Sequence, residues 1–424
     1  MKTLNSTSMQ TMIHHRDGSK TNTTHASLTL VVLFIIFQMD PRFIAEIIPN
    51  YYPVRYGSIA AIMAIISLLH YKSLFAGLKS GYWILLLLIF SLYQILSSTW
   101  SSQPLEGVFM GCCFFLAVTA ASAIGKNTSV GTIIHSFILS SLITTVSGAI
   151  LANLLPIYGQ EQMFLNRGDW TGFANQKNLY GYYSSLAGSI CLVKLLSNRF
   201  ESVIPISRRY SATAALILFT CALQSGSRGA LAITAIFTVV SLWLVFPLKR
   251  SQLSALFSLS TISLLIYSAI TFKVIDNDIS VFGSNLDSSN RFTLWMYGLS
   301  SIEQDLIFGV GRSGFWNQYR ADSFQSMYGW VLKNFHNTYV TIIVETGIVG
   351  IVIFISFTLA TFAYLLRGLQ SATNEGYIIA TALFSSLIAY SFIESTIGRT
   401  TTLSSFFALT VVASALMPKS IPEA

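Results

Sequence analysis

The residues best suited to chemistry gather in one polar interval, residues 273–350, of a chain that is otherwise a succession of apolar segments. Acidic and basic side chains alternate there with large aromatic ones. Only a few residues are needed to turn a chain between membrane spans, so a polar interval of about sixty residues indicates a function of its own. We expect the chemistry of this protein in that interval.

Arg291 is the first candidate in the interval. It follows Ser288-Ser289-Asn290, a typical helix N-cap, and residues 291–302 are amphipathic, which predicts a short helix lying on the membrane. The alternative is that Arg291 only contacts lipid headgroups. Two more candidates, Arg312 and Trp316, belong to a glycine-rich segment over residues 309–316. No predicted strand precedes this segment and no Lys-Ser or Lys-Thr pair follows it, so we reject a nucleotide site.

His336 stands next to Asn337, where the interval enters an apolar segment. A solitary histidine is most often structural, but this one lies among arginines and aromatic residues, which favours a catalytic or ligand-binding role. Glu345 follows about two helical turns into the apolar segment, where a buried carboxylate needs a partner.

Two motifs before the interval complete the candidates. The first contains Arg167, Lys177 and Asn178 and leads into an apolar helix. Lys177 at a helix start opposes the helix dipole, which suggests a bound anion, with lipid headgroups as the alternative partner. In the second motif, residues 225–229, Arg228 lies between two apolar segments. A charge at membrane depth needs a partner or a water-filled cavity, unless the motif is only the turn of a hairpin.

These residue types favour chemistry on an anionic leaving group. Of the six histidines, His14, His15 and His25 lie in the amino-terminal tail, and no cluster has the spacing of metal ligands. Positive charge can hold a phosphate while the histidine handles a proton. We therefore expect no metal, no cofactor and no nucleic-acid partner.

The composition places these candidates in a membrane. Hydrophobic residues make up 53% of the chain and charged residues only 10%, well below the roughly 25% charged residues of soluble proteins. We predict an all-α, polytopic integral membrane protein. A flexible cytoplasmic tail covers residues 1–26 and a single membrane domain residues 27–424, with one large extracytoplasmic loop, residues 273–336, that contains short helices.

A bilayer span needs about twenty apolar residues, and on this basis we predict about twelve transmembrane helices. The first is weak, because Asp40, Pro41, Arg42 and Glu46 lie in its second half, so it is expected to span only as far as Met39. The expected segments are 26–48, 57–69, 82–96, 107–124, 130–155, 179–196, 212–223, 230–246, 253–272, 338–366, 377–393 and 403–417.

Basic residues indicate the orientation. With the amino terminus in the cytoplasm, every short cytoplasmic connection carries at least one Lys or Arg, and the opposite short connections carry few. This places residues 158–177, 225–229 and 394–401 on the outer face together with the long loop.

Five of these motifs, in this order, resemble the O-antigen ligase and polymerase superfamily, and within it the polymerases of exopolysaccharide production. They are residues 172–181, 227–229, 289–295, 309–316 and 336–350. One position departs from the family pattern. Where the family commonly has His-Lys-Asn, this chain has Gln176-Lys177-Asn178, which argues against proton transfer at this point.

The resemblance implies a glycosyltransferase at the outer face of the bacterial inner membrane that uses undecaprenyl-diphosphate-linked glycans, without metal or cofactor. It implies that Arg228 and Arg291 hold the diphosphate, that His336 acts near the acceptor hydroxyl, and that direct displacement inverts the sugar carbon. The expected partners are the lipid-linked glycan, the bilayer and other polysaccharide assembly and export proteins. The expected substrate-binding residues are Lys177, Asn178, Arg167, Arg312, Trp316, Asn337 and Glu345.

Our hypothesis is a polymerase that builds an exopolysaccharide or O-antigen from lipid-linked repeat units. A ligase that hands the finished polymer to lipid A core or another acceptor shares the donor chemistry, so the sequence leaves this alternative open. A transporter or flippase needs a polar pathway to both faces, whereas the polar candidates here concentrate on the outer side. A scaffold has no need of Arg228, Arg291 and His336 on one face.

Overall fold

The computed structural model describes most of the chain, and the structural statements below concern the residues that it describes. The tail 1–26, the predicted span 253–272, the candidate Arg167 and most of the predicted loop before residue 291 lie outside them. The described residues are 27–48, 51–72, 81–162, 168–174, 176–201, 203–245, 280–281, 284–285, 291–328, 334–370, 375–398 and 403–417.

The described chain is almost entirely helical. The first predicted segment forms two helices, Ser27–Gln38 before Pro41 and Arg42–Ile47 after it. Proline lacks the backbone N–H that a helix interior needs, so a single helix does not continue through Pro41. The long helices are Ser27–Gln38, α3 (Tyr51–Leu69), α5 (Tyr82–Ser97), α6 (Pro104–Asn127), α7 (Val130–Leu154), α9 (Lys177–Leu196), α10 (Arg208–Gln224), α11 (Arg228–Val245), α15 (Thr338–Gly368), α16 (Glu375–Tyr390) and α17 (Leu403–Leu416).

Shorter elements connect the long helices. They are α2 (Arg42–Ile47), η1 (Ser98–Trp100), α8 (Pro156–Gly159), η3 (Gly172–Ala174), η4 (Asn198–Phe200), α13 (Arg291–Ser300) and α14 (Gln318–Tyr328). Two strands of two residues each, β1 (Ser280–Val281) and β2 (Ser284–Asn285), pair in antiparallel orientation.

Six helices of the described chain are long and apolar enough to cross a membrane: α3, α5 with η1, α6, α7, α11 and α15. Three further apolar helices, at residues 27–38, 375–390 and 404–416, are shorter. The protein is therefore an all-α, multi-pass membrane protein. The count of about twelve spans stays a prediction, as does the extracytoplasmic position of the loop.

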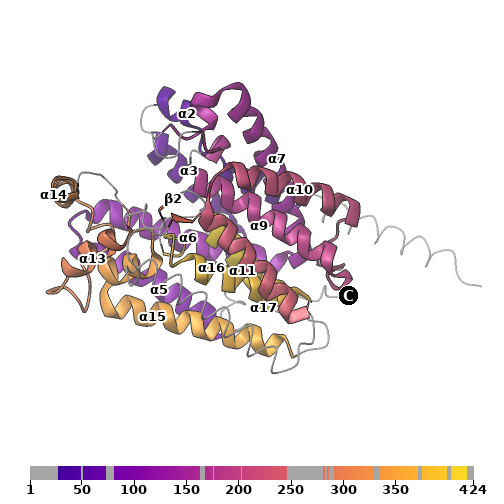
Figure 1. Ribbon diagram of the computed structural model, residues 1–424. Helices are drawn as coiled ribbons and strands as arrows, with labels where there is room; N and C mark the ends of the chain where they lie inside the picture. Colours follow the sequence, from indigo (N-terminus) through magenta and orange to yellow (C-terminus); the bar gives the residue numbers. More distant parts are fainter. Residues whose placement is uncertain are drawn as a thin grey trace, which may run out of the picture.

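The long helices pack side by side in one bundle (Figure 1). Helix α9 contacts α10 and α11, and a second series of contacts joins α11 to α16, α16 to α17 and α17 to α6. Helix α5 packs between α6 and α15. In the core, the ring of Phe137 stacks on that of Phe407 with centroids 3.9 Å apart, and Phe34 meets both rings edge-on.

Helices α13 and α14 lie together at one end of α5 and α15 (Figure 1). A separate apolar cluster holds them there, with Leu294 from α13, Phe324 from α14, and Phe315 and Phe335 from the connecting segments. Phe315 lies 4.9 Å from Phe335 between ring centroids. The polar interval that the sequence singled out is thus folded onto the bundle by its aromatic residues.

Helix α15 is interrupted at Gly347, whose φ of 66° and ψ of −164° are not helical. The segment beside the break pairs with the freed backbone: Ile348 N–H donates to Leu306 O at 2.9 Å, and Val310 N–H donates to Val344 O at 3.0 Å. Backbone groups inside a membrane protein need such internal partners. The break therefore fixes the glycine-rich segment against the first turns of α15.

Candidate functional site

Glu394 collects polar side chains from three distant segments. His336 Nδ1 lies 2.9 Å from Glu394 Oε2, and Arg291 Nη2 lies 3.4 Å from Glu394 Oε1. Asn178 Nδ2 donates to Glu394 Oε1 at 2.9 Å. Arg291 also donates through Nη1 to the carbonyl oxygen of Ile393. We call Glu394, Arg291, His336 and Asn178 the Glu394 cluster.

Helix ends position each member of the cluster. Arg291 is the first residue of α13, Asn178 lies in the first turn of α9, and Glu394 follows the end of α16. His336 precedes Asn337, whose side chain caps α15 by accepting from the N–H groups of Tyr339 and Val340. Side chains at helix ends are free of the helix's own packing and can converge on one point.

The backbone at His336 is unusual. Its φ is 49°, in the left-handed region that non-glycine residues adopt only at a cost. The backbone N–H of His336 donates to Asn334 Oδ1 at 3.1 Å, which helps to hold this conformation. With Nδ1 directed to Glu394, the ring keeps Nε2 for another partner. A carboxylate on Nδ1 favours the tautomer in which Nε2 is a proton acceptor.

Arg228 begins α11 beside the cluster. The hydroxyl of its neighbour Ser227 donates to Asn178 Oδ1 at 3.1 Å. A Cβ on Gly229, the next residue, would lie 3.0 Å from Ile393 Cδ1. The backbone of Arg228 therefore lies next to the Glu394 cluster, and its side chain is exposed.

Burial raises the pKa of Glu394, but its neighbours outweigh that effect. The hydrogen bond and charge of His336, followed by the charge of Arg291 and the hydrogen bond from Asn178, hold the pKa of Glu394 below its ordinary value. The cluster is thus built around an ionised carboxylate.

A cavity of about 650 Å³ opens beside the cluster. Glu394 and Asn178 line it, and so do Arg312, Trp316 and Glu345. Arg312 Nη1 pairs with Glu345 Oε2 at 3.0 Å, and the Arg312 side chain is only 3% exposed. Arg312 is thus the partner that the buried carboxylate of Glu345 requires.

Comparison with known proteins shows which family this chain resembles. A family model described as O-antigen ligase matches residues 213–355, a stretch that contains Arg228, Arg291, Arg312, His336 and Glu345. The chain is also 20% identical over 347 residues to the exopolysaccharide production protein ExoQ of Rhizobium meliloti (strain 1021). That alignment covers 76% of this chain and 75% of the relative.

The chain resembles the O-antigen ligase family over residues 213–355. It is a multi-pass membrane protein of the O-antigen ligase and polymerase type. Two members of the Glu394 cluster, Arg291 and His336, fall inside the region matched by the O-antigen ligase model, whereas Asn178 and Glu394 lie outside it.

Two predicted substrate-binding residues have partners within the chain. Lys177 Nζ lies 2.7 Å from Asp169 Oδ2, so the anion expected beside Lys177 is present as Asp169. Asn337 caps α15 and donates through Nδ2 to Phe392 O at 3.1 Å. For Asn337 the structure thus provides a structural role, and substrate binding by either residue stays a prediction.

Glu394 is the member that sequence reasoning missed. It was noted only as the start of a polar stretch after an apolar segment. Its partners His336, Arg291 and Asn178 are 58, 103 and 216 residues away in sequence. Its one local signal is a carboxylate at the end of an apolar helix on the face predicted to carry the other candidates. Among the described residues, no group of three or more His, Cys, Asp or Glu is placed to hold a metal ion.

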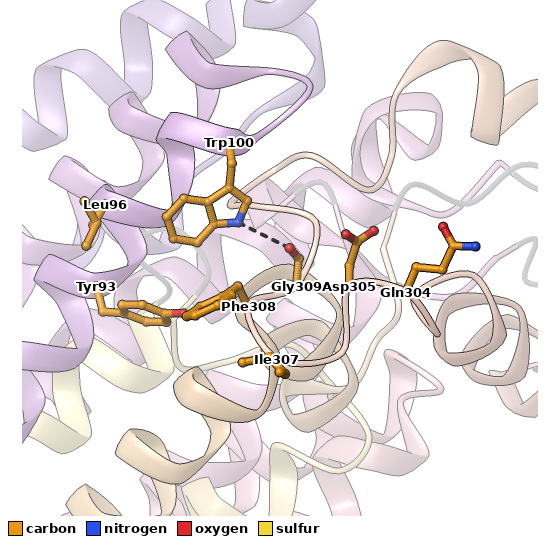
Figure 2. A pocket seen from close by; sticks show the side chains of 8 residues that line it. All are labelled: Tyr93, Leu96, Trp100, Gln304, Asp305, Ile307, Phe308 and Gly309. Carbon is orange, nitrogen blue, oxygen red and sulfur yellow. Dashed lines mark hydrogen bonds between the residues drawn. The ribbon is translucent and has the colours of Figure 1, made fainter.

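A second hollow of about 580 Å³ is shown in Figure 2. Tyr93, Leu96 and Trp100 meet the segment from Gln304 to Gly309 there, and Trp100 Nε1 donates to Gly309 O at 3.2 Å. The side chains of Ile307 and Phe308 lie towards Tyr93 (Figure 2). None of the predicted site residues lines this hollow, whereas Asn178, Arg312, Trp316 and Glu345 line the cavity beside Glu394.

Proposed function

We propose that this protein is a metal-independent, inverting glycosyltransferase of the bacterial inner membrane, with its active site on the periplasmic side. It joins repeat units carried on undecaprenyl diphosphate into an exopolysaccharide or O-antigen. The observation that carries the proposal is the joint contact of Arg291 and His336 with Glu394, at the edge of a polar cavity in a membrane protein of this family.

The donor end of the reaction needs positive charge. The bond from the anomeric carbon to the phosphate oxygen breaks, and undecaprenyl diphosphate leaves with the bonding electrons. Arg291 and Arg228 neutralise the charge that develops on the diphosphate, as a metal ion does in other enzymes. The lipid tail of the carrier stays in the bilayer, which explains why such a site belongs to a membrane protein.

The acceptor end needs a base. An acceptor hydroxyl attacks the anomeric carbon from the face opposite the diphosphate, and His336 Nε2 takes its proton. The new carbon–oxygen bond forms with inversion at that carbon. Glu394 holds Nδ1 and stabilises the imidazolium that results.

A polymerase is the first candidate because the relative that matches three quarters of this chain is named for exopolysaccharide production. A ligase is the second, because the matching family model is described as O-antigen ligase. The glycan profile of a deletion strain tells the two apart. Loss of long chains, with single units still attached to their acceptor, supports the polymerase; long chains left on the carrier support the ligase.

Arg291→Ala and His336→Ala test the proposed chemistry directly. Each removes a group that acts on the reacting atoms, so we expect polymer formation to fall by at least about 100-fold, with the protein still in the membrane. The measurement is polymer made by a complemented deletion strain, with protein quantified in the membrane fraction. Arg209→Ala, at an exposed arginine on the start of α10, is the matched control and should keep normal polymer. Normal polymer from either test variant would contradict the proposed roles.

A further inference from the structure

We propose that the part of the cavity formed by the turn before α6 and the glycine-rich segment binds an uncharged sugar of the acceptor glycan. We call this part the acceptor wall, defined by Gln103, Glu106, Arg312 and Trp316. All four line the same cavity as Glu394. The inference rests on the proposed function and adds where the second substrate lies.

The acceptor wall is a built surface, because two separate segments are joined there by side-chain to backbone hydrogen bonds. Ser102 Oγ donates to Gly314 O at 2.8 Å, and Gln103 Nε2 donates to Trp316 O at 3.3 Å. A Cβ on Gly311 would lie 2.6 Å from Ser101 Cα, so the two backbones are in direct contact. The groups on the wall are therefore held in place before any ligand arrives.

Two buried donors on the wall lack a partner. Arg312 Nε and Trp316 Nε1 are shielded from solvent and have no hydrogen-bond partner among the described residues. Buried N–H groups in native proteins are almost always satisfied, and an exception calls for a reason such as a ligand. Both residues line the cavity, so a small shift of either side chain would bring its N–H to an oxygen acceptor of a ligand there.

The charge of the wall argues against a second phosphate. The guanidinium of Arg312 is neutralised by Glu345, and Glu106, which lines the same cavity, makes no ion pair with another described residue. A phosphate would be repelled by Glu106, whereas sugar hydroxyls donate to a carboxylate and accept from Arg312 and Trp316. The arginine proposed to hold the donor diphosphate, Arg291, lies instead at the Glu394 cluster.

Aromatic surfaces complete the match to a glycan. Trp316 lies on the wall, and Tyr182 and Tyr390, whose rings stack with centroids 5.2 Å apart, line the same cavity beside Glu394. Aromatic rings carry large apolar faces with polar edges, which suits the mixed surface of a sugar ring. A glycan bound on the wall would extend towards Glu394, which contacts His336 Nδ1 at 2.9 Å.

A binding experiment on the purified protein in nanodiscs tests this placement. The probe is a set of oligosaccharide fragments released by partial acid hydrolysis from the polymer of the host strain, with binding followed by isothermal titration calorimetry. Trp316→Phe keeps an aromatic ring but removes the N–H, and Glu106→Gln keeps the shape but removes the charge. We expect each to raise the Kd about three- to tenfold, the effect of one lost hydrogen bond.

Two controls keep the outcomes separate. Glu303→Gln changes an exposed carboxylate outside the cavity and should bind the fragments as the wild type does. Inorganic pyrophosphate, added in excess, should not displace the fragments. The acceptor wall is overturned if Glu106→Gln and every folded Trp316→Phe preparation bind the fragments with the wild-type Kd. It is also overturned if pyrophosphate displaces the fragments. Glu106 is exposed, so its variant decides the matter if Trp316→Phe does not fold.

Arg291→Ala separates this inference from the proposed function. If both hold, the variant makes no polymer yet binds the fragments with the wild-type Kd. An active Arg291→Ala variant overturns the donor chemistry, whatever the fragments do. If Arg291→Ala makes no polymer and also no longer binds the fragments, the proposal that the acceptor wall binds glycan independently of Arg291 is overturned.

Discussion

At the scale of single residues, the site depends on a carboxylate that makes three polar contacts at once. Glu394 orients the ring of His336 through Nδ1 and contacts the guanidinium of Arg291 at 3.4 Å. In the proposed mechanism Glu394 is neither the nucleophile nor the group that takes the proton. Its contribution is to hold the imidazole and the guanidinium in one geometry, which is what a reaction between two bound substrates requires.

Glu394→Gln tests that contribution. The amide keeps the size of the side chain but removes the charge that stabilises the histidine cation, so we expect the transfer rate to fall about 10- to 100-fold. The rate is measured with lipid-linked donor in proteoliposomes. Glu303→Gln, an exposed carboxylate away from the cavity, is the control. A wild-type rate from Glu394→Gln would show that the cluster does not position His336.

The pKa of Glu394 predicts how stability depends on pH. The folded protein holds this pKa below the ordinary value of 4.5, so the ionised carboxylate stabilises the fold above that pH. The stabilisation is lost as the pH falls through the folded pKa. We expect the Tm of the wild type to exceed that of Glu394→Gln at pH 7 and the difference to shrink on acidification below about pH 4.5. Thermal unfolding in nanodiscs measures it, and a difference independent of pH would contradict it.

At the scale of elements, the break in α15 decides where the cavity lies. The interruption at Gly347 lets the backbone of residues 306–310 pair with α15, and this places Arg312 against Glu345. An unbroken helix would satisfy its own carbonyls and N–H groups and leave the glycine-rich segment without these partners. The buried ion pair and the acceptor wall both depend on this one backbone feature.

Gly347→Ala tests the break. Its left-handed φ is strained for alanine, and the added Cβ would meet the carbonyl of Ile307, so we expect a loss of about 1–3 kcal/mol of stability and a lower Tm. Gly57→Ala in α3 is the matched control, because a Cβ there meets nothing within 4 Å. The control should keep or slightly raise the Tm. Equal Tm values for the two variants would mean that the break does not require glycine.

At the scale of the whole molecule, the proposed orientation in the membrane would give the site access to the proposed lipid-linked donor. Gln162 lies in the segment before α9, and Arg209 lies at the start of α10, after the segment that follows α9. The two residues therefore mark the two ends of α9. Helix α9 is not among the six described helices that are long and apolar enough to cross a membrane. The sequence nevertheless predicts a span over residues 179–196, and the 20 residues of α9 extend about 30 Å, the thickness of a bilayer core. The Glu394 cluster lies at the Gln162 end, because Asn178 is in the first turn of α9.

Cysteine labelling tests the orientation. Gln162 and Arg209 are both exposed, so a cysteine at either position is accessible to reagent. We expect a membrane-impermeant maleimide to label Gln162→Cys from the periplasm and to label Arg209→Cys only after the inner membrane is permeabilised. The wild type, with its four native cysteines, gives the background. The reverse pattern would place the cluster on the cytoplasmic side, away from the proposed lipid-linked donor.

The sequence by itself determined the membrane class and most of the long helices that the structure describes, and it named Arg228, Arg291 and His336 as candidates. These properties are local: apolar length defines a helix in a membrane, and a motif is read from neighbouring residues. It could also state that Glu345 and Lys177 need partners, because an unpaired charge in such a place is costly.

Only the tertiary structure decided which residues meet. The partners turned out to be Arg312 for Glu345 and Asp169 for Lys177, and Glu394 joined side chains up to 216 residues away. Such meetings depend on how helix ends are brought together by packing across the bundle, and a single sequence carries no local record of them. The break at Gly347 is of the same kind, because its pairing with residues 306–310 depends on a segment folded back from before α15.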